Sequence, residues 1–175
     1  LYDAQLNKYR NLAKITDIKN KDKVLEIGCG WGGFSCFLAK NFSADVTAIT
    51  ISKKQYEKVK EKVYKEKLTE KVNVKLTDYR EIKGLYDKIV SIEMFEAVGE
   101  KYWSKYFDVL GSNLKHNGAI GLQTITIEDK FFKKYRKFPD FIQTYIFPGG
   151  MLPSIEEMSK VLKSKGLTIE KKQMF

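Results

Sequence analysis

The chain has 175 residues, the size of one domain with room for a hydrophobic core. Apolar residues make up 43% of it, which excludes a disordered chain, and no apolar run approaches the ~20 residues of a membrane-spanning helix. The formal net charge is +10, but only three of the 32 basic residues are arginine. Lysine gives diffuse attraction, whereas arginine gives the forked contacts that read phosphates and bases. The charge therefore indicates either solvated lysine faces or attraction to an anionic membrane face.

The apolar pattern alternates between helical and strand periods along the chain. In chain order it predicts a helix at 2–14, a strand at 23–27, a helix at 32–41, a strand at 46–51, a helix at 52–67, strands at 72–76 and 87–92, a helix at 101–114, a strand at 119–125, a helix at 154–165 and a strand at 167–174. Ser52 and Ser154 stand where helix N-caps belong.

Strands that alternate with helices predict an α/β fold with a doubly wound, mostly parallel sheet and helices on both faces. The last predicted strand would leave a bare sheet edge where the chain stops, which a complete domain rarely tolerates. We therefore expect a fragment, cut at both ends from a longer protein.

The two cysteines, Cys29 and Cys36, lie on a glycine-rich turn and on the helix predicted after it. No second cysteine pair or nearby histidine completes a zinc site, and we expect no disulfide between two cysteines so placed. The chain also opens on polar, lysine-rich residues without a signal-peptide pattern. These features predict a cytoplasmic protein with reduced thiols and no metal.

The most informative segment runs from Val24 to Gly33, where an apolar strand that carries Glu26 leads into a turn with four glycines. Glycine lets a ligand approach the backbone closely, and ligands of open α/β sheets bind where strand order reverses. The turn therefore predicts a nucleoside-bearing cofactor. Gly28, Gly30 and Gly33 also satisfy the dinucleotide fingerprint, but the second strand ends in Thr50 and not in the ribose-binding acid, so the glycines alone do not identify the cofactor.

Four motifs follow one another at Val24–Gly33, Thr47–Gln55, Asp87–Gly99 and Tyr145–Ser154. Together they resemble the cyclopropane-fatty-acyl-phospholipid synthase family, including its mycolic-acid relatives, over nearly the whole chain. The glycine turn alone would fit any class I methyltransferase that uses S-adenosylmethionine. The runs Met-Phe-Glu-Ala-Val-Gly and Ile-Phe-Pro-Gly-Gly-Met-Leu-Pro-Ser are far more specific.

The resemblance implies a single Rossmann-like, class I methyltransferase domain over residues 1–175. Such an enzyme transfers a methyl or methylene group from S-adenosylmethionine to the cis double bond of an unsaturated phospholipid acyl chain, giving a cyclopropane fatty acid. The implied cofactor contacts are Glu26, Gly28, Gly30, Gly32, Thr50, Ile51, Gln55, Asp78 and Tyr79. Some of these have structural alternatives: Asp78 could stabilise a turn, Tyr79 could belong to the core, and Gln55 could be a solvated helix residue.

Ring closure needs a base, and the family implies a bound bicarbonate held by a carboxylate and several polar groups. The matching positions here are Glu96, Gln123 and Ile125. The family commonly has histidine where this chain has Gln123, which can donate a hydrogen bond to an anion but carries no positive charge. A methyl- or methylene-branched product therefore stays open, as does a simple helix N-terminal role for Glu96.

Aromatic and basic residues interleave over residues 127–150, which we interpret as an insertion that walls an acyl tunnel and contacts anionic headgroups. The apolar members are Phe131, Phe132, Tyr135, Phe138, Phe141, Ile142, Tyr145 and Phe147. The basic members are Lys130, Lys133, Lys134, Arg136 and Lys137. An amphipathic helix packed on the sheet is the alternative. Aromatic residues among cations could also stack on nucleic acid, but the scarcity of arginine disfavours that partner.

Two other functions stay open at this point: a methyltransferase of the same fold acting on RNA or a small metabolite, and a cofactor- or lipid-binding module without turnover as this fragment. A homodimer is compatible with the sequence, which does not fix the oligomeric state. His116 is expected in a surface turn between a helix and a strand, so we assign it no chemical role.

Overall fold

The computed structural model describes residues 1–174 and divides into two compact units. Unit 1 contains Leu1–Ile92 and Ser112–Gln123, and unit 2 contains Glu93–Gly111 together with the chain from Thr124 onward. The single domain expected from the sequence stays a prediction. Within residues 1–174, no helix is long and apolar enough to cross a membrane.

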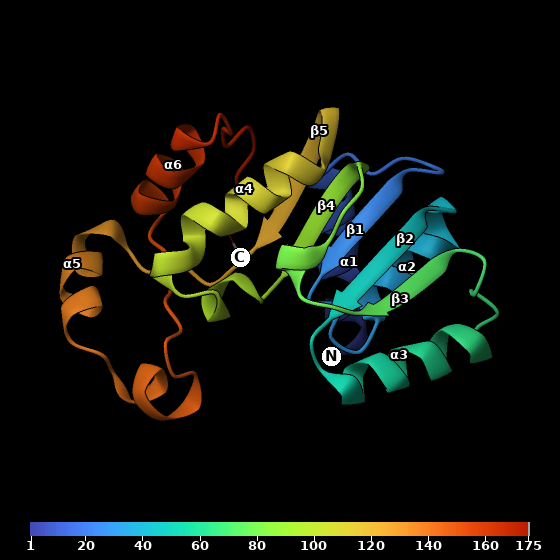
Figure 1. The fold of residues 1–175 in the computed structure, drawn as a ribbon, viewed down its shortest axis with the longest axis horizontal. Helices are drawn as coiled ribbons and strands as arrows, with labels where there is room; N and C mark the ends of the chain where they lie inside the picture. The colour runs from blue at the N-terminus through green and yellow to red at the C-terminus, as the bar shows by residue number, and fades with distance from the viewer. Residues whose placement is uncertain (175) are drawn as a thin grey trace. The chain divides into compact units, whose positions relative to one another are not determined.

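Unit 1 is built on one parallel sheet (Figure 1). Its strands are β1 (Lys23–Ile27), β2 (Asp45–Thr50), β3 (Val72–Leu76), β4 (Tyr86–Ile92) and β5 (Leu114–Gln123), in the order β3-β2-β1-β4-β5. The chain moves outward from β1 to β3 and then returns to the other side of β1 for β4. Strand order therefore reverses between β1 and β4, and a ligand crevice is expected at their carboxyl ends.

Helices α1 (Tyr2–Ile15), α2 (Gly33–Phe42) and α3 (Lys53–Lys65) share one hydrophobic core with this sheet. Helix α3 begins at Ser52, whose hydroxyl accepts from the Gln55 N–H at 3.3 Å, and it buries Val59 and Val63 one turn apart. Tyr9 of α1 lies 5.5 Å, centroid to centroid, from the ring of Phe34 on α2. Burial of each such side chain stabilises the unit by roughly 1.5–3 kcal/mol.

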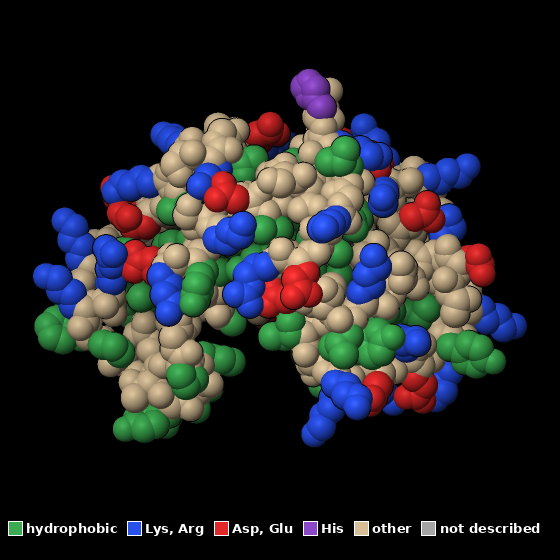
Figure 2. All heavy atoms as spheres, in the orientation of Figure 1, with side chains coloured by type: hydrophobic (Ala, Val, Ile, Leu, Met, Phe, Trp, Pro, Cys, Tyr) green, Lys and Arg blue, Asp and Glu red, His purple; other side chains and the backbone are tan. Residues whose placement is uncertain are grey.

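Unit 2 contains most of α4 (Trp103–Asn113), α5 (Asp129–Lys137), the π-helical turn η4 (Ile142–Ile146) and α6 (Ile155–Ser164). Its aromatic core centres on Phe95, whose ring centroid lies 5.2–5.4 Å from those of Trp103, Tyr106 and Phe107. Phe132 of α5 adds to it at 6.2 Å from Trp103. In the visible face of unit 2, hydrophobic side chains gather at one end and Lys and Arg lie above them (Figure 2).

Three expectations from the sequence differ from the structure. Residues 167–174 form no strand, because an alternating pattern supplies a preference but not the neighbouring strand that must pair with it. Strand β5 begins at Leu114, five residues early, and its register slips between the pairs Tyr86↔Leu114 and Lys88↔Ala119. His116 lies in this irregular stretch of β5, exposed, and not in a turn before the strand.

Candidate cofactor site and catalytic carboxylate

The glycine turn lies where the strand order reverses. The Gly28 and Cys29 N–H groups donate to the Ile49 carbonyl of β2 at 3.0 and 2.9 Å. On the other side, the buried Ser91 hydroxyl at the end of β4 donates to the Ile27 carbonyl at 3.1 Å. The turn is therefore fixed to both neighbours of β1, and it has little freedom to change shape.

Two glycines of the turn have different roles. Gly30 has φ +51°, and a Cβ added there would meet no heavy atom within 4 Å. Gly32 has φ +72°, and a Cβ added there would lie 2.7 Å from Val59 Cγ1 of α3. Gly30 therefore borders open space that a ligand could enter, whereas Gly32 is needed for close packing between the start of α2 and α3.

Glu26 is buried beneath the turn, with 2% of its surface exposed. The Ser35 hydroxyl and backbone N–H both donate to its carboxylate. Burial raises the pKa of Glu26 to about 7, although these hydrogen bonds and the charge of Lys62 oppose that rise. The N-cap of α2 is Gly32, which has no side chain, so the carboxylate of Glu26 takes the place of an N-cap side chain.

The sequence reading missed Ser35. Its signal was available, because Ser35 is the third residue of the helix that follows an acid-bearing strand, where capping hydrogen bonds are made. Cys29 and Cys36 are buried in the same region, and burial raises the pKa of each thiol to about 12, with the Glu26 charge adding to the effect on Cys29.

The end of β2 carries an ordered set of neutral polar groups. The Thr50 hydroxyl donates to Gln55 Oε1 at 2.7 Å and accepts from the Ser52 N–H at 3.1 Å. Because Oε1 of Gln55 is engaged by Thr50, its Nε2 is the group oriented to donate, as a ribose hydroxyl oxygen would require. Ile51, directly after β2, leaves 77% of its surface exposed.

At the end of β3, Asp78 accepts from Arg80 three times. Its Oδ1 receives the Arg80 backbone N–H and Nε at 2.9 Å each, and its Oδ2 receives Nη2 at 2.6 Å. These bonds to Arg80 lower the pKa of Asp78. The Arg80 guanidinium also lies 6.0 Å from the ring centroid of Tyr79. Arg80 was not identified from the sequence, although an opposite charge two residues after Asp78 was a visible signal.

These residues fit an adenosyl cofactor. Open space borders Gly30, and the Gln55 amide is oriented to donate. Three exposed apolar side chains lie at the carboxyl ends of the strands: Trp31 after β1, Ile51 after β2 and Leu76 at the end of β3. Apolar surface of this kind can cover an adenine ring, because flat aromatic groups are best sequestered from water.

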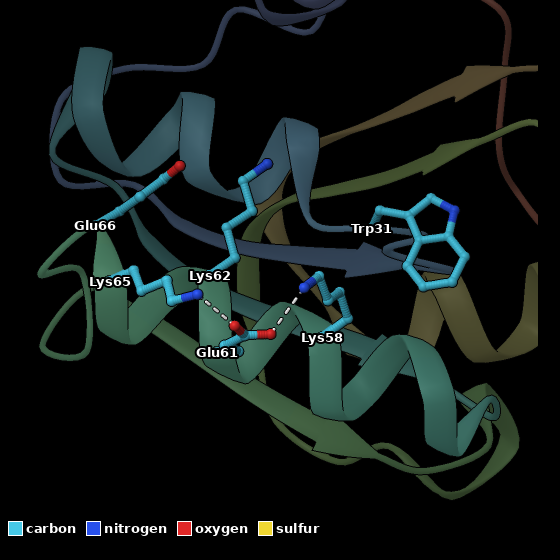
Figure 3. Close-up of a pocket in the computed structure, with 6 residues that line it drawn as sticks. All are labelled: Trp31, Lys58, Glu61, Lys62, Lys65 and Glu66. Atoms are coloured by element: carbon cyan, nitrogen blue, oxygen red, sulfur yellow. Dashed lines mark hydrogen bonds and ion pairs between the residues drawn. The ribbon is translucent and has the colours of Figure 1, made fainter.

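A separate pocket of about 450 Å³ opens between α2 and α3 (Figure 3). Its lining residues are Trp31, Lys58, Glu61, Lys62, Lys65 and Glu66. Glu61 pairs there with Lys58 and Lys65, which lowers its pKa to about 2. None of the residues predicted to bind the cofactor lines this pocket, and three of its five charged residues, Lys58, Glu61 and Lys65, pair with one another. The glycine turn is therefore the better candidate for a cofactor site.

In unit 2, Glu96 of the Met-Phe-Glu-Ala-Val-Gly motif makes a backbone contact with the Ile-Phe-Pro-Gly-Gly-Met-Leu-Pro-Ser motif. Its Oε1 accepts from the Ile125 N–H at 2.6 Å, and its backbone carbonyl accepts from the Met151 N–H at 2.8 Å. Its Oε2 is buried, without a hydrogen-bond partner among the described residues. Glu96 and Ile125 are thus brought together, whereas Gln123 ends β5 in unit 1. A buried, unpaired carboxylate oxygen is costly, and it fits a site that accepts a proton-bearing ligand.

The aromatic residues of 127–150 are of two kinds. Phe132 is 3% exposed and packs on Trp103, whereas its neighbour Phe131 is 49% exposed. Most of the apolar residues after α5 are exposed as well. Within residues 1–174, no group of three or more His, Cys, Asp or Glu side chains could hold a metal ion.

The chain matches the family described as mycolic acid cyclopropane synthetase over residues 1–175. It is 36% identical over 153 residues to the tuberculostearic acid methyltransferase UfaA1 of Mycobacterium tuberculosis, a match that covers 87% of this chain and 36% of that protein. It is 37% identical over 160 residues to the cyclopropane-fatty-acyl-phospholipid synthase of Escherichia coli, covering 91% of this chain and 40% of that protein. The chain thus spans about two-fifths of the length of these curated relatives.

Among solved structures, the chain is similar to the mycolic acid cyclopropane synthase CmaA1 complexed with SAH and CTAB. The TM-score is 0.88 at 27% identity, over 97% of this chain and 63% of that one. This likeness confirms the predicted fold class, a parallel sheet with helices of the class I methyltransferase type.

Proposed function

The chain belongs to the mycolic acid cyclopropane synthetase family, and from this premise we propose that it binds S-adenosylmethionine and serves transfer of a one-carbon unit to an unsaturated phospholipid acyl chain. The observation that carries the proposal is the glycine turn at the reversal of strand order, open at Gly30 and organised by buried Glu26. SAH in a solved relative and the lipid-modifying activities named for the two curated relatives support it.

Nine residues would hold the cofactor, which supplies an electrophilic methyl group. Gly28, Gly30 and Gly32 shape the turn, and the Gln55 amide donates to a ribose hydroxyl. Thr50 orients Gln55, and Ile51 covers the adenine with its exposed side chain. Asp78 and Tyr79 would lie at the adenine end, where Oδ2 of Asp78, which accepts one hydrogen bond from Arg80, keeps a lone pair for the exocyclic amine.

Glu26 would respond to the charge of its ligand. Its pKa of about 7 leaves the carboxyl close to half-ionised at neutral pH. A cationic ammonium group nearby favours the carboxylate over the neutral acid. Binding of the cofactor would therefore release protons from Glu26, and the carboxylate would remain held by Ser35.

Glu96 and Ile125 of unit 2 would hold a bicarbonate ion, which supplies a proton acceptor, and a contribution from Gln123 of unit 1 stays a prediction. The Ile125 N–H fixes Oε1 of Glu96, so the buried Oε2 is the oxygen that receives a hydrogen bond from the ligand. The cofactor would supply its methyl group to one alkene carbon, with the methyl–sulfur bond broken and its electron pair left on sulfur, so that a cation would remain on the neighbouring chain carbon. Loss of a proton from the added methyl group to a base gives the electron pair that closes the ring.

A methyl-branched product is the second candidate. The glutamine at position 123 carries no charge to fix an anionic base, and one of the curated relatives is named as a methyltransferase. Both outcomes share the first step and differ in the proton that the chain cation then loses: loss from the added methyl group closes a ring, and loss from a neighbouring chain carbon leaves a methyl-branched alkene.

We further propose that the substrate lies at an anionic membrane surface on the cytoplasmic side. The net charge of +10 favours such a surface. The homodimer compatible with the sequence stays a prediction.

The test uses methyl-labelled S-adenosylmethionine and vesicles of dioleoyl phosphatidylglycerol. We expect calorimetric binding of the cofactor to the chain and label in the acyl fraction. Mass spectrometry before and after ozonolysis separates the products, because a cyclopropane resists ozone and a methylene branch does not. Cofactor binding with label only in RNA or a small metabolite would contradict the lipid assignment, and absence of cofactor binding would contradict the proposal as a whole.

The role of Glu96 is tested by Glu96→Gln, which keeps an acceptor for the Ile125 N–H. We expect product to be lost and cofactor affinity to be retained. Glu100→Gln is the matched control. Glu100 is a glutamate four residues after Glu96, but its carboxylate pairs with Arg136 at 2.8 Å. Equal loss of product in both variants would remove the special role of Glu96.

A further inference from the structure

The segment Phe138–Gly150, here called the aromatic loop, exposes apolar side chains at an unusual density. The exposed members are Phe138, Phe141, Ile142, Tyr145, Ile146 and Phe147. Single exposed apolar residues are ordinary, but a contiguous group of this kind marks an interaction site. Tyr145 alone leaves 71% of its surface in contact with solvent.

The loop is held in this shape by a buried amide. Gln143 Oε1 accepts from the Asp140 N–H at 3.1 Å, and the Gln143 N–H donates to Asp140 Oδ1 at 2.8 Å. Gln143 Nε2 reaches across the loop to the Gly150 carbonyl at 3.3 Å. The polar groups of the loop are therefore satisfied inside it while its apolar side chains point outward, the reverse of a normal surface loop.

Basic residues predominate beside the loop. Helix α5 ends at Lys137 and exposes Lys133, Lys134 and Lys137, whereas Asp140, the acid within the loop, accepts from Gln143. Figure 2 shows the result in unit 2, with hydrophobic side chains at one end and a band of Lys and Arg above them. An apolar tip below a cationic band matches the layers of an anionic bilayer, where acyl chains lie below phosphates.

We propose that the aromatic loop inserts into the interface of an anionic lipid bilayer, with Lys133, Lys134 and Lys137 on the headgroup phosphates. This inference rests on the proposed function for its choice of a lipid partner. Phe and Tyr side chains suit the boundary between headgroups and acyl chains, because their rings are apolar and Tyr keeps a polar end. A protein partner fits less well, since protein interfaces exclude charge from their centres and rely on complementary shape.

The first test measures sedimentation of the chain with vesicles of phosphatidylcholine, with and without phosphatidylglycerol. The tip variant combines Phe141→Ser, Tyr145→Ser and Phe147→Ser, and we expect it to lose vesicle affinity about tenfold or more. The control combines Tyr64→Ser and Leu85→Ser, which are also exposed apolar positions but lie in unit 1. Retained affinity in the tip variant, or an equal loss in the control, would overturn the proposal.

The cation band is tested by changing Lys133, Lys134 and Lys137 to Gln. We expect affinity for phosphatidylglycerol vesicles to fall about fivefold for each lysine, with little change on pure phosphatidylcholine. The loss should shrink as salt is raised, because exposed charges are screened. A loss independent of lipid charge would overturn the role of the lysines.

The insertion itself is tested with Ile142→Cys carrying an environment-sensitive fluorophore, since Cys29 and Cys36 are buried. We expect the emission to shift to the blue on addition of anionic vesicles and to be quenched by quenchers within the acyl chains. Unchanged emission would overturn insertion. Blue-shifted emission before vesicles are added would show that a second copy or another part of the protein covers the loop.

The tip variant should bind S-adenosylmethionine as the unsubstituted chain does. Vesicle binding without cofactor binding in the unsubstituted chain would contradict the proposed function and leave the membrane contact standing. Cofactor binding without vesicle binding would do the opposite.

Discussion

The glycine turn of unit 1 and the aromatic loop of unit 2 are each shaped around one buried polar side chain. In the turn, Glu26 accepts from Ser35 and fixes the start of α2. In the loop, Gln143 exchanges hydrogen bonds with Asp140 and reaches the Gly150 carbonyl. One side chain carries an ionisable group and organises a small opening; the other is neutral and supports a broad apolar surface.

The difference follows from what each region is proposed to contact. A small cationic ligand gains from a nearby carboxyl group whose charge can adjust, so burial of Glu26 is tolerated. A lipid surface needs area and no fixed charge beneath it, and a neutral amide supplies rigidity at lower desolvation cost. In both regions a buried polar group thus shapes the surface that is proposed to bind.

The largest expected effect compares a buried and an exposed phenylalanine that are adjacent on α5. Phe132→Ala should lower the free energy of unfolding by about 3–5 kcal/mol, because it removes a buried ring from Trp103. The adjacent Phe131→Ala should cost far less, about 0.5 kcal/mol, since half of that ring is already exposed. Urea unfolding measures both. Similar losses at the two positions would mean that α5 lies differently from its place in the structure.

The charge of the turn is tested by Glu26→Gln across pH. The carboxyl titrates near 4.5 when unfolded and near 7 when folded, so the folded chain holds the extra proton between these values. The unsubstituted chain should therefore lose stability as pH rises through that window, on the order of 3 kcal/mol, and the glutamine variant should not.

Urea unfolding at about pH 4 and about pH 8 measures this slope. Glu61→Gln serves as the control of opposite sign, because the pKa of Glu61 is lowered to about 2 and its contribution is lost as pH falls. An unchanged slope in Glu26→Gln would show that the carboxyl is not buried as the structure has it.

The opening of the turn is tested with two glycines of matched geometry. Gly30 and Gly166 have φ of +51° and +70°, and a Cβ at either meets nothing within 4 Å. Alanine at each should cost about 1–2 kcal/mol of stability for the left-handed backbone. Only Gly30→Ala should also lower the affinity for S-adenosylmethionine, by about tenfold as measured by calorimetry. Equal cofactor affinity in both variants would show that the ligand does not approach Gly30.

The smallest effect is expected in the aromatic loop. Tyr145→Ser should change the free energy of unfolding by less than about 0.5 kcal/mol, because the side chain is mostly exposed. Thermal unfolding without lipid checks this. A large loss would indicate that the loop stabilises the protein, which would weaken the contrast between a structural turn and a contact surface.

The sequence predicted the sheet of unit 1 well, because each element carries its own local signals. Strands β1 and β3 occupy the predicted residues, and Ser52 and Ser154 cap α3 and α6 as expected. Prediction failed where the secondary structure of a segment depends on pairing with a strand distant in the sequence. Residues 167–174 alternate like a strand but have no partner within the described sheet, and the start of β5 depends on pairing with Tyr86.

The candidate site shows the same limit. Ordered motifs located the turn and Glu96, but the residues assigned to cofactor and catalysis stay predictions. The partners of these residues were harder to find than the residues themselves. Ser35 beneath Glu26 and Arg80 on Asp78 had local signals that were not used, whereas the contact of the Ile125 N–H with Glu96 depends on how two distant segments meet, which residue spacing does not encode.

The buried thiol of Cys29 has a consequence for chemical self-protection. A thiolate, and not a thiol, is the nucleophile that a sulfonium methyl group could alkylate, and Cys29 lies in the turn proposed to receive such a group. With a pKa of about 12, the sulfur stays protonated at neutral pH and is a poor target for alkylation. The burial of Cys29 would thus prevent methylation of the protein by its own cofactor. Mass spectrometry of the intact protein after long incubation with the cofactor would detect any methylated Cys29.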